Sequence, residues 1–306
     1  MIVIGESIHI ISKGVREAVE NRDRAFIQDL AKRQVEKGAG VLDLNLGPQK
    51  KAGVEVMNWM LDTVQEVTDI RLSLDTTNAA AIEAGLKKCP PKTIINSTTA
   101  DPERMKVLMP LAAQHDAILI CLTLRATGLP VSADARVEIV AEDLMTAAME
   151  YGLPFENILF DPLVLTVNGT QEHGPEVIKA TRIIKQLNDP PFQTACGLSN
   201  VYNSCPTDIR PLLNRVYLTM LAGAGMDAPI ADAFDDELME TIHIIENRDG
   251  STPKGKLLLA IHDSIANDEE FDPSIADMSD PVQSGIVKTV KVLQYQTLYA
   301  HGYLNL

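Results

Sequence analysis

The sequence GAGVLDLNLG, at residues 38–47, gives the clearest indication of the fold of this chain. It contains a short apolar run, Val41–Leu46, of the length expected for a buried strand. Apolar residues recur at helical spacing before it, over Asp23–Lys37, and after it, over Val54–Val67. A strand between two amphipathic helices is the unit from which parallel sheets are built, so this stretch predicts a repeating βα unit.

The same alternation extends outward in both directions, from the first residues to about residue 245. Eight strands, each followed by a helix, favour a closed (β/α)8 TIM barrel. The further strands predicted are Ile2–Glu6, Arg71–Asp75, Thr93–Asn96, Ala117–Thr123, Ile158–Asp161, Thr194–Ser199 and Asp227–Asp232, and the further helices are Ala79–Lys88, Pro102–His115, Ala133–Tyr151, Pro175–Leu187, Asp208–Leu221 and Asp235–Ile245.

A doubly wound open sheet is the structural alternative, but it usually carries a glycine-rich phosphate loop after its first strand. Here that place reads GESIH, residues 5–9. We expect one domain over residues 1–306, with an insertion at about 246–281 that is rich in Asp, Glu, Ser, Pro and Gly around Leu257–Ile265. The insertion is either a solvated excursion or a docking element, and Gly285–Tyr299 then resumes an amphipathic helix.

Composition narrows the classes of partner. The 306 residues carry 27 Lys+Arg against 42 Asp+Glu, a formal net charge of -15, which disfavours nucleic acid and anionic membrane surfaces. The four cysteines form no C-x-x-C pair and are expected to be reduced. No apolar run approaches the ~18 residues of a membrane span, and the opening MIVIGE lacks a basic leader, so we expect a cytoplasmic protein.

Polar residues end all eight predicted strands. Because the carboxyl ends of barrel strands meet at one mouth, these side chains should gather there. A single Asp or Asn after a strand is more often a turn former or helix cap, but eight together are harder to explain in that way. Carboxylates and amides without clustered Lys or Arg suit a neutral, hydrogen-bonding heterocycle such as a pterin. The eight are Glu6, Asn45, Asp75, Asn96, Thr123, Asp161, Asn200 and Asp232.

Two other kinds of site are weakly supported. The six histidines show no paired metal-ligand spacing, so we predict no bound metal. No G-x-S-x-G elbow marks a nucleophilic serine.

Six short motifs at the predicted strand ends resemble those of the pterin-binding methyltransferases, and are most similar to the methyltetrahydrofolate:corrinoid protein methyltransferases. The resemblance covers about residues 1–245 and 285–300, and it implies the same barrel. The motifs are GAGVLDLNLG (38–47), LDTTN (74–78), INST (95–98), DPL (161–163), GLSN (197–200) and IADAFDD (230–236).

The resemblance implies a role for each matching residue. Asp75, Asn96 and Asp161 would hold the pterin edge, and Asn200 would lie beside N5, which carries the methyl group. The remaining substrate-binding residues expected are Asn45, Gly197, Ser199, Glu6, Asp232 and Arg215, the last meeting the p-aminobenzoyl-glutamate tail or serving as a structural arginine. The family commonly reads GERIN at the first strand, so Ser7 and His9 depart from its pattern.

The implied reaction moves a methyl group between N5 of tetrahydrofolate and the cobalt of a corrinoid, in a direction that the sequence leaves open. The chain has no D-x-H-x-x-G corrinoid signature, so the corrinoid would come on a separate protein. The family also implies a homodimer. The methyl source stays open among acetyl-CoA synthesis, O-demethylation, and methylamine or betaine catabolism.

Two alternatives stand beside this interpretation. One is a dihydropteroate synthase, which should show a Lys near strand seven and an S-x-R motif near strand eight, where this chain reads GLSN and IADA. The other is a non-catalytic folate-binding barrel.

Overall fold

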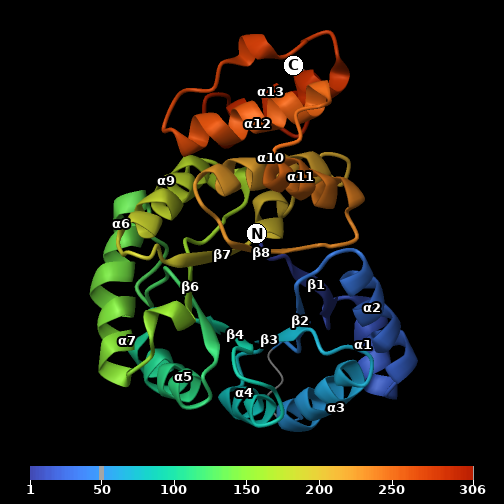
Figure 1. Cartoon of the computed structure of the whole chain (residues 1–306), viewed down its shortest axis with the longest axis vertical. Helices are drawn as coiled ribbons and strands as arrows, with labels where there is room; N and C mark the ends of the chain where they lie inside the picture. Colours follow the sequence, from blue (N-terminus) through green and yellow to red (C-terminus); the bar gives the residue numbers. More distant parts are fainter. Residues whose placement is uncertain (48–51, 306) are drawn as a thin grey trace.

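Eight parallel strands close into a barrel in sequence order, which confirms the predicted TIM barrel (Figure 1). The structure is a computed structural model that describes residues 1–47 and 52–305. The strands are β1 (Ile4–His9), β2 (Val41–Asn45), β3 (Arg71–Asp75), β4 (Ile94–Thr98), β5 (Ile118–Leu122), β6 (Ile158–Asp161), β7 (Gln193–Gly197) and β8 (Ala228–Ala231).

Helices surround the barrel between successive strands (Figure 1). Side-chain caps fix several of their starts, as where Asn78 accepts hydrogen bonds from the N–H groups of Ala80 and Ala81. The barrel helices are α1 (Lys13–Asn21), α2 (Arg24–Glu36), α3 (Gly53–Gln65), α4 (Ala79–Leu86), α5 (Pro102–Gln114), α6 (Ala133–Glu138), α7 (Met145–Tyr151), α8 (Val167–Thr170), α9 (His173–Gln186), α10 (Arg210–Gly223) and α11 (Asp236–Asn247). A π-helical turn, η1 (Ile139–Leu144), joins α6 to α7, and 3-10 turns form η2 (Phe155–Asn157) and η3 (Leu198–Tyr202).

Two elements near the amino terminus differ from the sequence prediction. β1 runs past Glu6 to His9, because a bulge between Gly5 and Ile8 carries the strand beyond its apolar start. The following helix, α1, was not predicted, since its nine residues bury only Val15, Ala18 and Val19.

Two further helices lie outside α10 and α11, at the opposite side of the molecule from α3 and α4 (Figure 1). The stretch 246–281 contains α12 (Pro253–Ala266), which packs on α10 and buries Leu257 and Ile261. A short 3-10 turn, η4 (Pro273–Ile275), leads to α13 (Pro281–Leu293), and η5 (Tyr303–Asn305) ends the described chain. The last helix begins earlier than the predicted Gly285–Tyr299, because Asp280 caps its start. It also ends earlier, at Leu293, shortly before Tyr295 adopts a left-handed conformation.

The side chains inside the barrel change from apolar to polar along its axis. Aliphatic side chains near the strand starts form a separate cluster within the barrel, whereas the strand ends carry Asp and Asn. The cluster consists of Ile4, Val41, Ile94, Ile118, Ile120, Leu159, Ala195 and Ala228. In the described ranges, no helix is long and apolar enough to cross a membrane.

Candidate functional site

The bulge in β1 brings the side chains of Glu6 and Ser7 to the carboxyl end of the barrel. Ser199 Oγ, from η3, donates a hydrogen bond to the Glu6 carboxylate. Ser7 Oγ donates to Asp232 Oδ1, just after β8, at 3.1 Å. These contacts join the ends of β1, β7 and β8, and they place three predicted residues, Glu6, Ser199 and Asp232, in one group.

A second group joins β2, β3 and β4 around Asp43. The Asp43 carboxylate accepts hydrogen bonds from Ser73 Oγ at 2.6 Å and from Asn96 Nδ2 at 3.2 Å. Beside it, the Asn45 amide donates to the Asp75 carboxylate. The predicted residues Asn45, Asp75 and Asn96 therefore lie together.

Asp43 itself was missed by the sequence analysis. It lies two residues before Asn45 on the same strand, and residues two apart on a strand face the same side. The sequence did carry a signal for Asp43, because a carboxylate within the apolar run VLDLN must face a polar partner if it is buried. The structure supplies the partners, and Asp43 is only 3% exposed.

Burial raises the pKa of the carboxyl groups in this second group. Removal from water disfavours the charged form, so the pKa values of Asp43 and Asp75 are both raised. The charge of Asp43 adds to the effect on Asp75, and Arg104 opposes it. The two carboxyl groups therefore retain protons at a pH where exposed aspartates have lost them.

Glu6 and Asp161 show the same effect on the other side of the mouth. Burial raises the pKa of Glu6 to about 7, with a further rise from Asp232 and Asp43. Burial also raises the pKa of Asp161 to about 7, although Asp161 Oδ1 accepts a hydrogen bond from the Leu163 N–H at 2.8 Å. Perturbed carboxyl groups gathered at the mouth of a barrel are typical of a functional site.

A buried arginine holds the loop that follows Asp161. Arg136, with no exposed surface, donates to the Pro162 carbonyl at 2.7 Å and to the Ser132 carbonyl at 3.1 Å. Its third contact is His173 Nδ1, at 3.1 Å. Burial and the Arg136 charge lower the pKa of His173, which keeps this ring neutral as an acceptor. Arg136 thus fixes the backbone of Pro162, the residue that follows Asp161.

Asn200 lies in η3, three residues beyond the end of β7, and its side chain is exposed. Asn203 Nδ2 donates to Asn200 Oδ1 at 3.2 Å, which leaves the Asn200 amide nitrogen free to donate. A Cβ atom built on Gly197 would lie only 2.8 Å from this nitrogen. The glycine at 197 therefore allows the Asn200 amide to fold back over the end of β7.

The structure does not bring Arg215 into this group. Its guanidinium contacts Asp235 and Glu237 of the α11 start, on the outer helical layer. The alternative of a structural arginine, which the sequence left open, matches this position. The hydroxyl of Thr123, just after β5, is buried and has no hydrogen-bond partner among the described residues. Among those residues, no group of three or more His, Cys, Asp or Glu has an arrangement that could hold a metal ion.

Known proteins resemble this chain in sequence and in fold. The family described as "Pterin binding enzyme" matches residues 13–232. A methylcorrinoid:tetrahydrofolate methyltransferase from Eubacterium limosum is 29% identical, over 79% of this chain and 89% of its own length. A methionine synthase from Mycobacterium tuberculosis is 32% identical over 76% of this chain, which spans only 20% of that longer protein.

Solved structures agree on the fold. A dihydropteroate synthase from Thermus thermophilus superimposes with a TM-score of 0.56 and 15% identity, over 80% of this chain and 92% of that one. At this identity the likeness concerns the barrel alone.

Proposed function

The chain belongs to the family of pterin binding enzymes, and from this membership we propose that it transfers a methyl group between N5 of tetrahydrofolate and the cobalt of a corrinoid carried by another protein. The observation that carries the proposal is the gathering of Asp75, Asn96, Asp161 and Asn200 at one end of the barrel. The similarity to a methylcorrinoid:tetrahydrofolate methyltransferase over most of both chains supports it.

The chemistry of the mouth fits a pterin. The aminopyrimidinone edge of a pterin presents N–H donors at N3 and the 2-amino group, and carboxylates such as Asp75 and Asp161 accept from such donors. The Asn96 carboxamide can serve both donors and acceptors. Burial raises the pKa of both aspartates, so a ligand that donates hydrogen bonds to their charged forms would relieve part of the desolvation cost.

In the proposed step, the Co(I) electron pair attacks the methyl carbon as the bond from carbon to N5 breaks. The electron pair of that bond stays on N5, which gains a proton from solvent and leaves as a neutral amine. We assign the free amide nitrogen of Asn200 as the hydrogen-bond donor to N5, since its oxygen is engaged by Asn203. A donor aimed at developing charge stabilises the transition state more than the ground state. The same alignment of cobalt, carbon and N5 serves the reverse reaction.

Asn200→Ala tests this assignment. We expect methyl transfer between methyltetrahydrofolate and free cob(I)alamin to slow about a hundredfold, with little change in folate affinity, because one transition-state donor is typically worth ~3 kcal/mol. Asn247→Ala, which alters an exposed asparagine on α11, is the matched control and should keep full activity. A loss of less than a few-fold in Asn200→Ala would remove Asn200 from the mechanism. Folate binding by the wild-type protein without any methyl exchange would favour the non-catalytic barrel.

The partner and the oligomeric state follow from the same proposal. We propose that a corrinoid protein approaches the carboxyl end of the barrel, where Asn200 is exposed, and that the chain forms a homodimer. Addition of the corrinoid protein should raise the rate well above that with free cobalamin. Sedimentation equilibrium measures the mass of the assembly directly.

A further inference from the structure

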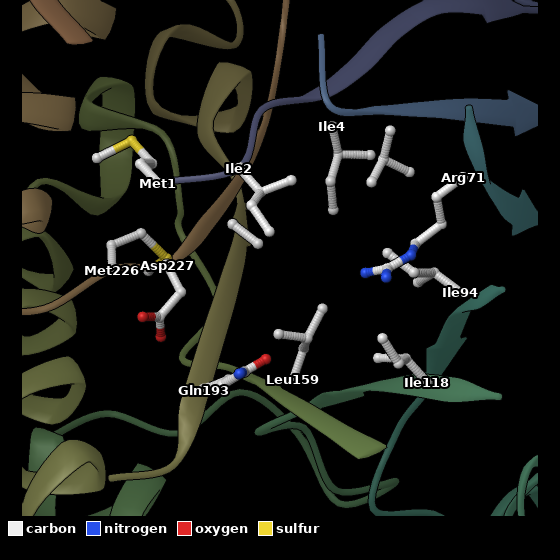
Figure 2. Close-up of a pocket in the computed structure, with 12 residues that line it drawn as sticks. Met1, Ile2, Ile4, Arg71, Ile94, Ile118, Leu159, Gln193, Met226 and Asp227 are labelled. Carbon is white, nitrogen blue, oxygen red and sulfur yellow. The ribbon is translucent and has the colours of Figure 1, made fainter. Parts of the chain in front are cut away.

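A cavity lies at the amino-terminal end of the barrel, opposite the polar mouth. Its volume is about 220 Å³, and Figure 2 shows its lining. The walls are aliphatic side chains from the starts of six strands, namely Ile4, Val41, Ile94, Ile118, Leu159 and Ala228. The inside of a TIM barrel is normally filled by layers of side chains, so unfilled space here departs from the usual packing.

One exposed cation lies at the edge of this apolar space. Figure 2 shows the Arg71 guanidinium projecting from the start of β3 among the aliphatic side chains. Within residues 1–47 and 52–305, Arg71 makes no ion pair and no side-chain hydrogen bond. The chain carries 42 Asp+Glu against 27 Lys+Arg, so acidic partners for an arginine are plentiful elsewhere.

The acidic residue that lines the cavity, Asp227, does not serve as the partner of Arg71. Asp227 Oδ2 instead accepts hydrogen bonds from Lys185 Nζ at 2.7 Å and from the Thr194 N–H at 2.8 Å. The Met1 ammonium is likewise engaged by Glu246. The rim therefore presents one unpaired positive charge above an apolar floor.

We propose that this cavity binds a small carboxylic acid with a branched aliphatic chain, whose carboxylate pairs with Arg71 and whose chain enters the barrel. A guanidinium recognises a carboxylate through two parallel hydrogen bonds. An apolar cavity of about 150 Å³ suffices for benzene, so the present cavity has room for an aliphatic chain of about five carbons. The site is separate from the pterin site and does not depend on the function proposed for it.

Titration calorimetry with 4-methylpentanoate tests the proposal on the whole chain. We expect a dissociation constant on the order of 1 mM, as is reasonable for about eight non-hydrogen atoms. The uncharged analogue 4-methylpentanamide should bind about tenfold more weakly, because it lacks the charge that Arg71 recognises. Absence of saturable binding by the carboxylate would refute the site.

Arg71→Gln should weaken binding of the carboxylate about tenfold and leave the amide unchanged. Arg16→Gln is the matched control, since Arg16 is also exposed and unpaired in the described structure, and it should bind as the wild type does. Ala228→Leu should block both compounds by filling the cavity, with thermal unfolding measured to confirm that this variant folds. Equal affinity in wild type and Arg71→Gln, or displacement of the carboxylate by tetrahydrofolate, would overturn the proposal.

Discussion

The two ends of this barrel are built from the same eight strands but have opposite chemistry. β6 shows the contrast within four residues, since Leu159 lines the apolar cavity and Asp161, two positions later on the same face, lies at the polar mouth. β3 differs at its start, where the charged Arg71 stands at the apolar end of the barrel, but like β6 it ends on an aspartate, Asp75, at the polar end. One strand can therefore supply an apolar wall at its start and a buried carboxyl group at its end.

The largest effect that would test this contrast is the pH dependence of stability. Burial raises the pKa of Glu6 and of Asp161 to about 7, from ordinary values of 4.5 and 3.8. At a pH between the ordinary and the raised pKa values, the folded chain holds protons that the unfolded chain has released. The free energy of unfolding therefore falls as the pH rises through this range. We expect these two groups to contribute a fall on the order of 4 kcal/mol between about pH 5 and pH 8, since one pKa unit corresponds to about 1.4 kcal/mol.

Urea denaturation at several pH values measures this fall. The double variant Glu6→Gln, Asp161→Asn should show a shallower profile, and the slope that is left comes from Asp43 and Asp75, whose pKa values burial also raises. A profile as steep as that of the wild type would assign the pH dependence to other groups.

The next effect concerns the apolar end. Leu159→Ala should lower the free energy of unfolding by about 3 kcal/mol, because it removes a side chain that is 4% exposed and enlarges a cavity. The affinity of the folded protein for tetrahydrofolate should not change. Urea denaturation and calorimetric titration measure the two quantities separately, and a loss of folate affinity would contradict the division between the ends.

The converse is expected at the polar end. Asp161→Asn should weaken tetrahydrofolate binding by about 2 kcal/mol, or about thirtyfold, because hydrogen bonds to a charged group are lost. Stability at about pH 8 should hold or rise, since a buried carboxylate is replaced by a neutral amide. Calorimetry at that pH checks the affinity. Unchanged folate affinity would place the pterin elsewhere.

The smallest expected effect is on kcat and concerns how Gly197 positions the Asn200 amide at the polar end. Gly197→Ala should reduce kcat for methyl transfer about tenfold, or about 1.4 kcal/mol, because its Cβ would meet Asn200 Nδ2 at 2.8 Å and displace the amide. The KM for methyltetrahydrofolate should change little. Steady-state kinetics separate the two parameters, and Gly250→Ala, at a position where no atom lies closer than 3.6 Å to the added Cβ, is the control.

Much of the fold could be predicted from the sequence because its signals are local. β3 and β6 occupy the predicted residues, since each is a short apolar run that ends on an aspartate. The helix α1 was missed because its buried face is small, and β1 extends further because a bulge leaves no mark in the apolar pattern. In the stretch 246–281, the apolar piece Leu257–Ile265 is part of a helix that buries it against α10.

The order of the strands and helices, and the polar residue types at the strand ends, follow from the amino-acid sequence alone, because hydrophobic period and turn residues are properties of neighbouring positions. Which of those polar groups meet depends on how the whole chain folds. Glu6 and Ser199 are 193 residues apart, and Asp43 finds Ser73 and Asn96 on two other strands. Arg215, in turn, contacts α11. Such contacts depend on the register and closure of the whole barrel, which no local pattern encodes.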